Sequence, residues 1–403
     1  MTMEEHAMGD GNDTSRRGVI GLGLAGATAA IAGPAIAAGE KAARAGGADR
    51  VGIAIVGLGK LSQDQLLPSL TRTRRAHLAA LVSGDPAKAA RIAGQYDVPR
   101  TSIYSYETYD RIIRDPAIEI VYIVLPNHLH AEYTIRALKA GKHVLCEKPM
   151  ATNVADAEAM IAAARQADRK LMIAYRCHYE PGNLAAMRRI RSGAIGKPRL
   201  VVTDMGRQSS LADPSDAWRL DAVKSGGGAL ADMGVYGINA ARYLLGEEPI
   251  EVRAWASTDR SDPRFRSVED LIAWQFRFPS GAIANGSTSF NCDGTMALQV
   301  IGEKGRIVAD PACFYGGNRL TFGAPSGETV PIVEIDQFAR EMDWMADVVR
   351  GRAPMVAPGE EGLQDMRLME AIQQSVRRGG ETIRTDWGYR RAVDPAAVVD
   401  VAS

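Results

Sequence analysis

The chain has 403 residues, and its 48 Lys and Arg residues balance its 48 Asp and Glu residues, so its formal net charge is zero. This balance argues against a nucleic acid or an anionic membrane as the partner, because both attract a basic excess. The length is sufficient for two domains. The four cysteines, Cys146, Cys177, Cys292 and Cys313, contain no C-x-x-C pair, which favours free buried thiols and gives no support for a metal site.

The N-terminus has the pattern of an export signal. Ser15-Arg16-Arg17 opens an apolar run rich in Gly and Ala, which ends near Ala35-Ile36-Ala37. This is the pattern of a twin-arginine signal with cleavage near Ala37. A membrane anchor is the alternative, but the run is poor in Leu and Phe. We therefore expect residues 1–50 to be signal and linker, and the mature protein to be periplasmic, exported folded and without a stable membrane anchor.

From residue 51 onward, strand and helix patterns alternate. Apolar runs predict strands at 52–56, 78–82, 120–125, 143–146 and 171–174. Helices are expected after the glycines near residue 58 and at 86–95, 106–114, 131–140 and 153–167. Asp85 is expected to cap the helix that begins at Pro86. Strands separated by helices of this length predict a doubly wound parallel sheet, so residues 51–175 are interpreted as a Rossmann domain.

After Tyr175 the pattern changes to strands that follow one another without intervening helices. They are expected at 199–203, 250–256, 271–278, 281–289, 296–301 and 305–308, with helices at 183–191, after Gly228, and at 337–350 and 360–377. This predicts a second domain of the α+β class, over residues 176–403, with a large mixed or antiparallel sheet. We expect it to bind substrate and to form a homodimer or homotetramer.

A glycine-rich turn follows the first predicted strand. Gly57-Leu58-Gly59-Lys60 lies between that strand and a helix, which is the setting of a dinucleotide-binding turn. The first glycine permits the tight turn and the second lets the backbone approach a pyrophosphate. Ser62 replaces the third glycine of the usual pattern, so a turn without a ligand is the alternative. The flanking elements favour dinucleotide binding.

The end of the second predicted strand suggests which dinucleotide is bound. An acidic residue usually stands there and binds the ribose 2′-hydroxyl of NAD. In this chain the position reads Ser83-Gly84-Asp85-Pro86-Ala87-Lys88. The Ser83 hydroxyl and the Lys88 ammonium suit a 2′-phosphate, which favours NADP, while Asp85 keeps NAD as the alternative.

Two further strand ends lie at the edge where open α/β sheets bind ligands. At the first, Leu125 precedes Asn127, which can bond cofactor ribose or carboxamide, and His130, for which a packing role is the alternative. At the second, Glu147 and Lys148 precede Pro149. A cis proline there would direct Lys148 into the crevice.

The segment from Gly226 to Gly237 supplies the other candidate catalytic residues. Asp232 and Tyr236 are four positions apart, so a helix would present both on one face. Beside Lys148, the Tyr236 phenol could take a proton from a sugar hydroxyl, with Asp232 holding that hydroxyl or orienting Lys148. A capped helix with a buried tyrosine is the alternative.

Together these motifs resemble the glucose–fructose oxidoreductase and aldose–aldose oxidoreductase branch of the GFO/IDH/MocA family. The resemblance rests on Ala54 to Lys60, Glu132 to Ala151, Tyr175 to Tyr179, Tyr243 to Pro249 and Thr385 to Tyr389. Most of the family has histidine where this chain has Tyr236, and this branch has tyrosine.

The resemblance implies an oxidoreductase with tightly held NADP. It implies ping-pong oxidation of an aldose at C1 to the lactone and reduction of a second sugar, fructose or an aldose, to the alditol. The implied catalytic residues are Lys148, Asp232 and Tyr236. The candidate cofactor-binding residues are Gly57, Leu58, Gly59, Lys60, Ser83, Lys88, Tyr104, Leu125, Asn127, His130, Glu147, Lys148, Arg176, Trp218, Arg219 and Tyr315.

The chain departs from that branch at two places. The long proline-rich arm expected between the signal and the first strand is replaced by about a dozen residues. The resemblance therefore does not by itself imply that an arm retains the cofactor or that the protein is a tetramer. His128 replaces a smaller serine and can change which second sugar is accepted. Three alternatives stay open: an ordinary NADP-dependent aldose dehydrogenase or reductase, an NAD-dependent glycosidase, and a non-catalytic sugar sensor.

Overall fold

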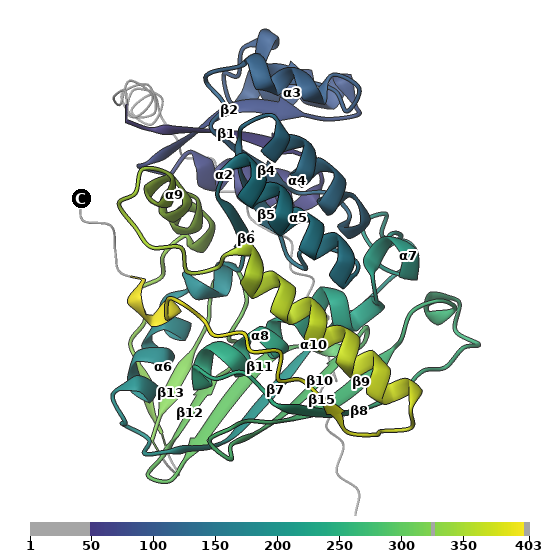
Figure 1. Ribbon diagram of the computed structural model, residues 1–403, viewed down its shortest axis with the longest axis vertical. Coiled ribbons are helices and arrows are strands. Elements are labelled where there is room, and N and C mark those ends of the chain that lie inside the picture. Colours follow the sequence, from purple (N-terminus) through teal and green to yellow (C-terminus); the bar gives the residue numbers. More distant parts are fainter. Residues whose placement is uncertain (1–48, 324–326, 399–403) are drawn as a thin grey trace, which may run out of the picture. The chain divides into compact units, whose positions relative to one another are not determined.

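The computed structural model describes residues 49–323 and 327–398 (Figure 1). They fall within one compact unit, Gly46–Ser403. The predicted export signal and its cleavage site lie outside the described residues. Among the described helices, none has the length and apolar character needed to cross a membrane.

The first domain is built on a parallel sheet of six strands in the order β3-β2-β1-β4-β5-β6. These strands are β1 (Val51–Val56), β2 (Ala76–Val82), β3 (Ile103–Tyr104), β4 (Ile120–Ile123), β5 (His143–Glu147) and β6 (Leu171–Ala174). The order reverses direction between β1 and β4, which is the switch point where doubly wound sheets bind ligands. The expected Rossmann sheet is therefore confirmed.

Helices connect these strands. They are α2 (Leu67–Leu70), which continues a π-helical turn at Ser62–Leu66, then α3 (Pro86–Gln95), α4 (His130–Lys139) and α5 (Val154–Ala167). As expected, the Asp85 side chain caps α3 by accepting from the Lys88 backbone N–H.

The helix expected at 106–114 is shorter than predicted. Only Tyr109–Arg114 is helical, and it is a 3₁₀ helix. Ser105 and Thr108 bond each other's backbone N–H groups, which holds the preceding residues in a turn. Pro116 follows Asp115 and disfavours the α conformation there, so the segment cannot extend.

The second domain contains a mixed sheet of nine strands in the order β14-β13-β12-β11-β7-β10-β9-β8-β15. The strands are β7 (Pro198–Gln208), β8 (Glu251–Ser257), β9 (Leu271–Arg277), β10 (Ile283–Ser289), β11 (Asn291–Gly302), β12 (Arg306–Ala309), β13 (Leu320–Phe322), β14 (Glu328–Val330) and β15 (Ile383–Arg384). Only β7 and β10 pair in parallel; the other described pairs are antiparallel. The short strands β13, β14 and β15 were not expected from the sequence.

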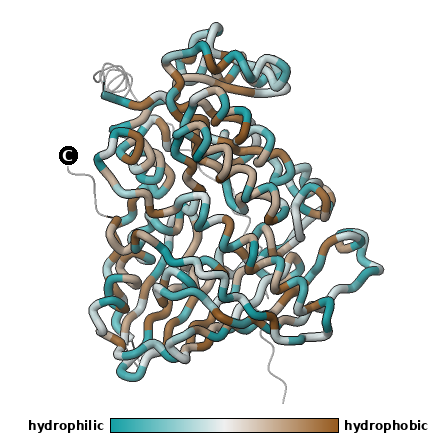
Figure 2. Tube along the Cα trace, in the orientation of Figure 1, coloured by the Kyte–Doolittle hydropathy of each residue, from teal (hydrophilic) through white to brown (hydrophobic). Residues whose placement is uncertain are grey.

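The helices of the second domain are α6 (Pro181–Arg191), α7 (Ala222–Ser225), α8 (Val235–Leu245), α9 (Gln337–Val349) and α10 (Gly359–Arg377). A π-helical turn, Leu230–Gly234, leads directly into α8. Figure 2 shows apolar residues gathered along the inner strands and polar residues at the turns, in agreement with the buried core. Residues of both domains take part in one continuous core.

Candidate active site

The glycine turn after β1 has the shape required to approach a dinucleotide. Gly57 has φ of 96°, and a Cβ there would lie 2.3 Å from the Val124 carbonyl oxygen. A Cβ on Gly59 would meet nothing within 4 Å, so open space lies above the turn. Ser62 Oγ donates to the Gly57 carbonyl at 2.6 Å, which holds the turn against the following helix. The turn therefore fits a pyrophosphate, with Leu58 buried beneath it and Lys60 exposed beside it.

At the end of β2, the predicted 2′-phosphate contacts are close to one another. Ser83 is buried, and its Oγ accepts from the Asp85 backbone N–H at 3.1 Å. The Asp85 carboxylate caps α3 and lies 3.8 Å from Lys88 Nζ. Because Asp85 is engaged with its own helix, its carboxylate is partly neutralised at this edge.

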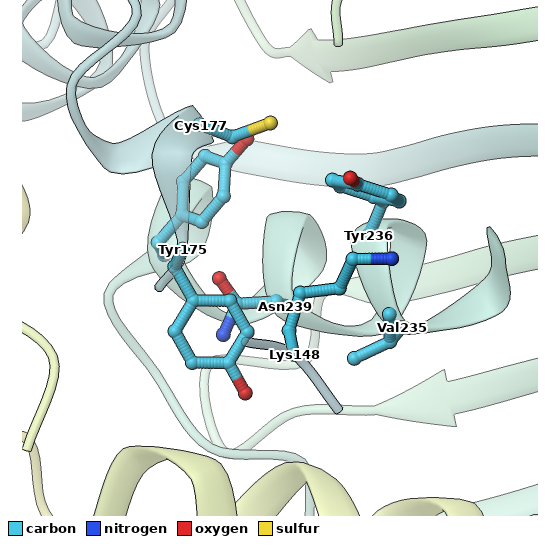
Figure 3. A pocket seen from close by; sticks show the side chains of 7 residues that line it. Lys148, Tyr175, Cys177, Val235, Tyr236 and Asn239 are labelled. Carbon is cyan, nitrogen blue, oxygen red and sulfur yellow. The ribbon is translucent and has the colours of Figure 1, made fainter. Parts of the chain in front are cut away.

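Lys148 extends from the end of β5 toward the second domain. The Lys148–Pro149 peptide is cis, as expected. Lys148 Nζ donates to the Asp232 carbonyl oxygen at 2.8 Å and lies 3.7 Å from Asp232 Oδ1. It also lies 4.4 Å from the centre of the Tyr236 ring. Figure 3 shows the two side chains next to each other. Burial lowers the pKa of Lys148, while Asp232 and Glu147 favour its charged form.

Three cations surround the Asp232 carboxylate. In addition to Lys148, Arg219 Nε lies 3.1 Å and Arg207 Nη2 3.2 Å from Asp232 Oδ2. Burial alone would raise the pKa of this carboxyl, but Arg219, Lys148 and Arg207 together hold it well below its usual range. Asp232 is therefore ionised at neutral pH and keeps Lys148 in place.

Tyr236 lies between two cations. Arg176 Nη2 donates to the Tyr236 hydroxyl oxygen at 3.1 Å, and the Lys148 ammonium lies over the Tyr236 ring at 4.4 Å from its centre. Arg176 is itself fixed by bonds to Gln337 Oε1 at 2.8 Å and to the Cys313 carbonyl oxygen at 2.5 Å. Burial raises the pKa of Tyr236 above its usual value, and Arg176 opposes this rise. The resting phenol is neutral, with both cations placed to stabilise a phenolate.

Several predicted contacts border this constellation. Tyr315 stacks on Arg176 at 4.8 Å and packs against Phe338. The Trp218 ring lies 4.3 Å from the Arg219 guanidinium. Tyr175, Cys177, Val235, Asn239 and Tyr243 line the pocket together with Lys148 and Tyr236 (Figure 3).

Other predicted contacts have protein partners. Asn127 is buried and donates to the Ser225 carbonyl oxygen at 2.8 Å. His130 is fully buried, with its ring nitrogens 2.8 Å from the Leu125 carbonyl oxygen and 2.9 Å from that of Pro149. Burial lowers its pKa to about 4. The ring therefore connects the ends of two strands, which is the packing role that the sequence left as the alternative. It can affect a ligand only through those strand ends.

Tyr104 also has a partner within its own domain. Its hydroxyl donates to Asp115 Oδ2 at 2.8 Å, and burial raises its pKa to about 12. The direct cofactor contact expected for Tyr104 therefore stays a prediction.

Sequence reasoning missed three residues that complete the site. Arg207 stands at the end of β7, Gln337 opens α9, and the Cys313 backbone fixes Arg176. Arg207 and Asp232 are joined only because β7 passes beneath the turn before α8. Nothing local distinguishes these residues in the sequence, since the strand expected at 199–203 stops short of Arg207, which β7 reaches only in the structure.

The site joins a dinucleotide-binding edge to a charged group able to move protons. Gly57, Gly59 and the end of β2 offer positions for the cofactor, and Lys148 follows the end of β5 in the same sheet, with Tyr236 beside it and Arg176 bonded to Tyr236. A neutral phenol flanked by two cations can donate a proton or, once ionised, accept one from a hydroxyl. The fold and the site together define a nicotinamide dinucleotide-dependent oxidoreductase.

Comparisons with known proteins agree with this class. Residues 51–175 match the oxidoreductase family with an NAD-binding Rossmann fold, and residues 183–308 match the GFO/IDH/MocA C-terminal domain. The chain belongs to the GFO/IDH/MocA oxidoreductase family, which confirms the family predicted from the sequence.

Two kinds of relatives are similar over most of the chain. The crystal structure of an aldose-aldose oxidoreductase from Caulobacter crescentus complexed with glycerol is 45% identical, with a TM-score of 0.79, covering 83% of this chain and 99% of that chain. D-xylose 1-dehydrogenase [NADP(+)] from Haloarcula marismortui is 33% identical, over 83% of this chain and 93% of its own length. D-xylose 1-dehydrogenase (NADP(+)) 2 from Haloferax volcanii is 29% identical, over 81% and 97%.

Proposed function

We propose that this protein is a periplasmic sugar oxidoreductase that holds NADP(H) tightly and couples two sugars in ping-pong order. It oxidises an aldose at C1 to the lactone and reduces a second sugar, an aldose or fructose, to the alditol. One observation carries the proposal: Tyr236 lies between Lys148 and Arg176 at the ligand edge of the dinucleotide-binding sheet.

Each residue of the site has a role in that reaction. When bound, the nicotinamide would accept a hydride from the sugar carbon and return it to the second sugar. Once ionised, the Tyr236 oxygen takes the proton of the C1 hydroxyl and becomes a neutral phenol, which then gives that proton to the second sugar's carbonyl oxygen. Arg176 and Lys148 favour the phenolate that exists before the first transfer and after the second, and Asp232 holds Lys148 in place.

NADP is favoured by the end of β2. A 2′-phosphate placed there would meet the Ser83 hydroxyl and the Lys88 ammonium, while the nearby Asp85 carboxylate is engaged in capping α3. The relatives named D-xylose 1-dehydrogenase are NADP(+) enzymes by name, which supports the same choice.

The coupling of two sugars is supported by the likeness to an aldose-aldose oxidoreductase at 45% identity. The twin-arginine pattern at Arg16 and Arg17 supports export. Outside the cytoplasm no nicotinamide pool would regenerate the cofactor, so a second sugar as electron acceptor closes the cycle.

The test uses the mature protein purified without added nucleotide. We expect a nicotinamide absorbance band that changes when glucose is added and reverts when a second aldose or fructose follows. Product analysis should find an aldonate and an alditol in equal amounts. No alditol, with stoichiometric reduction of added NADP, would rule out the coupling.

The xylose dehydrogenase relatives favour one second candidate, an NADP-dependent aldose dehydrogenase with exchangeable cofactor. It predicts a protein that is purified free of nucleotide and that depends on added NADP for every turnover. Hydrolysis of a nitrophenyl glycoside without net redox change would instead identify an NAD-dependent glycosidase.

A further inference from the structure

Two buried side chains, Tyr122 and Glu341, and the half-buried Glu147 form a hydrogen-bonded cluster behind Lys148 that draws on both domains. The Tyr122 hydroxyl of β4 lies 2.8 Å from Glu147 Oε1 and 3.4 Å from Glu341 Oε2 of α9. Tyr122 and Glu341 are 0% exposed. Glu147 immediately precedes Lys148, and its Oε2 accepts from the Lys148 backbone N–H at 3.3 Å. The cluster therefore ends at the backbone of the reactive lysine.

The number of protons in this cluster is restricted by geometry. A phenol has one proton and can donate it to only one carboxylate. If both Glu147 and Glu341 were ionised, one carboxylate oxygen would face the Tyr122 oxygen without a proton between them, in a buried setting where unpaired acceptors are costly. A proton on one of the two carboxyls removes this conflict, as in other close carboxyl pairs.

The surroundings identify Glu341 as the protonated member. Its Oε1 has no hydrogen-bond partner among residues 49–323 and 327–398, and no cation contacts it within ion-pair distance there. Glu147 instead accepts from Tyr122 and from the Lys148 backbone. Burial raises the pKa of both carboxyls, and the Glu147 charge raises that of Glu341 further, whereas Lys148 opposes the rise at Glu147.

We propose that Glu341 is a positioning residue that keeps a proton at neutral pH and donates it to Tyr122, which in turn donates to Glu147 and holds the Lys148 turn in its working orientation. The order of donation is Glu341 carboxyl to Tyr122 oxygen, then Tyr122 hydroxyl to the Glu147 carboxylate. This inference rests on the proposed function for its catalytic consequence, but the protonation state itself does not depend on it.

The inference predicts a pH effect. The groups that face Glu341 from the elements packed against α9 are Tyr122, Glu147, Arg176, Cys177 and Tyr179. When alkaline pH removes the Glu341 proton, two carboxylates compete for the Tyr122 proton and Glu147 loses its donor. The kcat should then fall at alkaline pH because Glu341 loses its proton, although Glu341 is not one of the residues that line the pocket.

The experiment compares three variants of the full-length protein. Glu341→Gln replaces the acid by an amide that also donates to Tyr122. Tyr122→Phe removes the bridge. Glu119→Gln is the matched control, because Glu119 pairs with Arg350 at 2.6 Å and its pKa is lowered mainly by that bond, so it is an ionised carboxylate. Infrared difference spectra report whether a protonated carboxyl band is present. The pH profiles of kcat report whether the Lys148 turn keeps its working orientation.

We expect Glu341→Gln to lose a protonated-carboxyl band that Glu119→Gln retains. Its kcat should stay within about threefold of the parent at neutral pH, with the alkaline limb moved to higher pH. Tyr122→Phe should lower kcat about tenfold, with a smaller effect on KM, because a bond to a charged group is lost.

A Glu341→Gln spectrum without band loss, or a kcat reduced as strongly as in Tyr122→Phe, would overturn the inference. If the parent shows no sugar turnover, the proposed function fails while the infrared comparison still decides the protonation of Glu341. If Glu341→Gln does not fold, a protonated band that shifts in Tyr122→Phe supports the inference, and one that does not shift contradicts it.

Discussion

Tyr236 is the residue whose environment says most about the reaction. Its hydroxyl accepts a bond from the Arg176 guanidinium and its ring centre lies 4.4 Å from the Lys148 ammonium, so two cations lie close to a phenol that ionises. Burial alone keeps the phenol neutral by raising its pKa. The balance between burial and these two charges lets one side chain take up and release a proton.

Tyr236→Phe tests this role directly. Because the ring is retained and only the hydroxyl is lost, kcat should fall by about 100-fold or more while nucleotide affinity stays the same. The measurements are single-turnover rates and NADPH fluorescence titration. Tyr389→Phe serves as the control, since its hydroxyl bonds Glu361 away from the pocket. Undiminished turnover in Tyr236→Phe would be expected of a sugar sensor or of a different catalytic base.

Asp232 connects catalysis to acid stability. Its pKa is lowered in the folded state by Arg219, Lys148 and Arg207, against the effect of burial. Its ionised form therefore stabilises the fold above the unfolded-state pKa of about 4, and this contribution is lost as pH falls through the lower folded-state value.

Asp232→Asn should lower the free energy of unfolding by about 3 kcal/mol at pH 7, because three cations lose their counter-ion. The difference from the parent should shrink as pH falls below about 4. Urea unfolding between pH 3 and pH 7 measures both. A difference that does not depend on pH would show that packing, and not charge, accounts for the loss.

Lys88 should contribute to the choice of nucleotide. Lys88→Ala removes the cation beside Ser83 and should weaken NADP binding about tenfold while leaving NAD binding nearly unchanged. Lys139→Ala, an exposed lysine at the end of α4, is the control. Fluorescence titration measures the affinity for both nucleotides. An equal loss of affinity for NAD and NADP would show that Lys88 does not bind the 2′-phosphate.

Among the elements, α8 and α10 are joined by a buried ion network. Arg242 of α8 is 0% exposed and pairs with Glu361 and Asp365 of α10 and with Glu248. Arg391, near the C-terminus, pairs with Glu361 at 2.6 Å. The helix α8, which carries Tyr236 in its first turn, is thus held to its neighbour by charges that are almost entirely buried.

Arg242→Met should destabilise the fold by about 3–5 kcal/mol, because it leaves buried carboxylates without a partner. Arg367→Met provides the contrast: Arg367 lies on α10 and pairs with the half-exposed Glu158, so its loss should cost at most about 1 kcal/mol. Urea midpoints measure both variants. Equal midpoints would show that the buried network contributes no more than a surface pair.

At the scale of the elements, local sequence predicted some boundaries well and others poorly. The bounds of α3 and β6 agree with the sequence because a proline, a capping aspartate or a short apolar run marks them locally. The 3₁₀ helix Tyr109–Arg114 and the strands β13 to β15 lack such markers. Their conformation depends on neighbouring strands and on side-chain bonds that periodicity does not report.

For the whole molecule, export before catalysis is the distinctive proposal. Changing Arg16 and Arg17 together to lysine should keep the protein in the cytoplasm, because the twin-arginine route reads that pair. Cell fractionation with an activity assay measures the outcome, and Arg44→Lys, outside the motif, is the control. Unchanged periplasmic activity in the double variant would contradict the proposed route.

The sequence alone determined the order of the long strands and helices, the glycine turn at Gly57 and the family, because these depend on local periodicity and short motifs. Only the tertiary structure placed Arg176 on Tyr236, Arg207 on Asp232 and Glu341 beside Tyr122. The members of these pairs are 25 to 219 residues apart in the chain, and they meet only once the elements that carry them have packed together. The electrostatics of the site are therefore a property of the assembled domains, while its location follows from the first strand and turn.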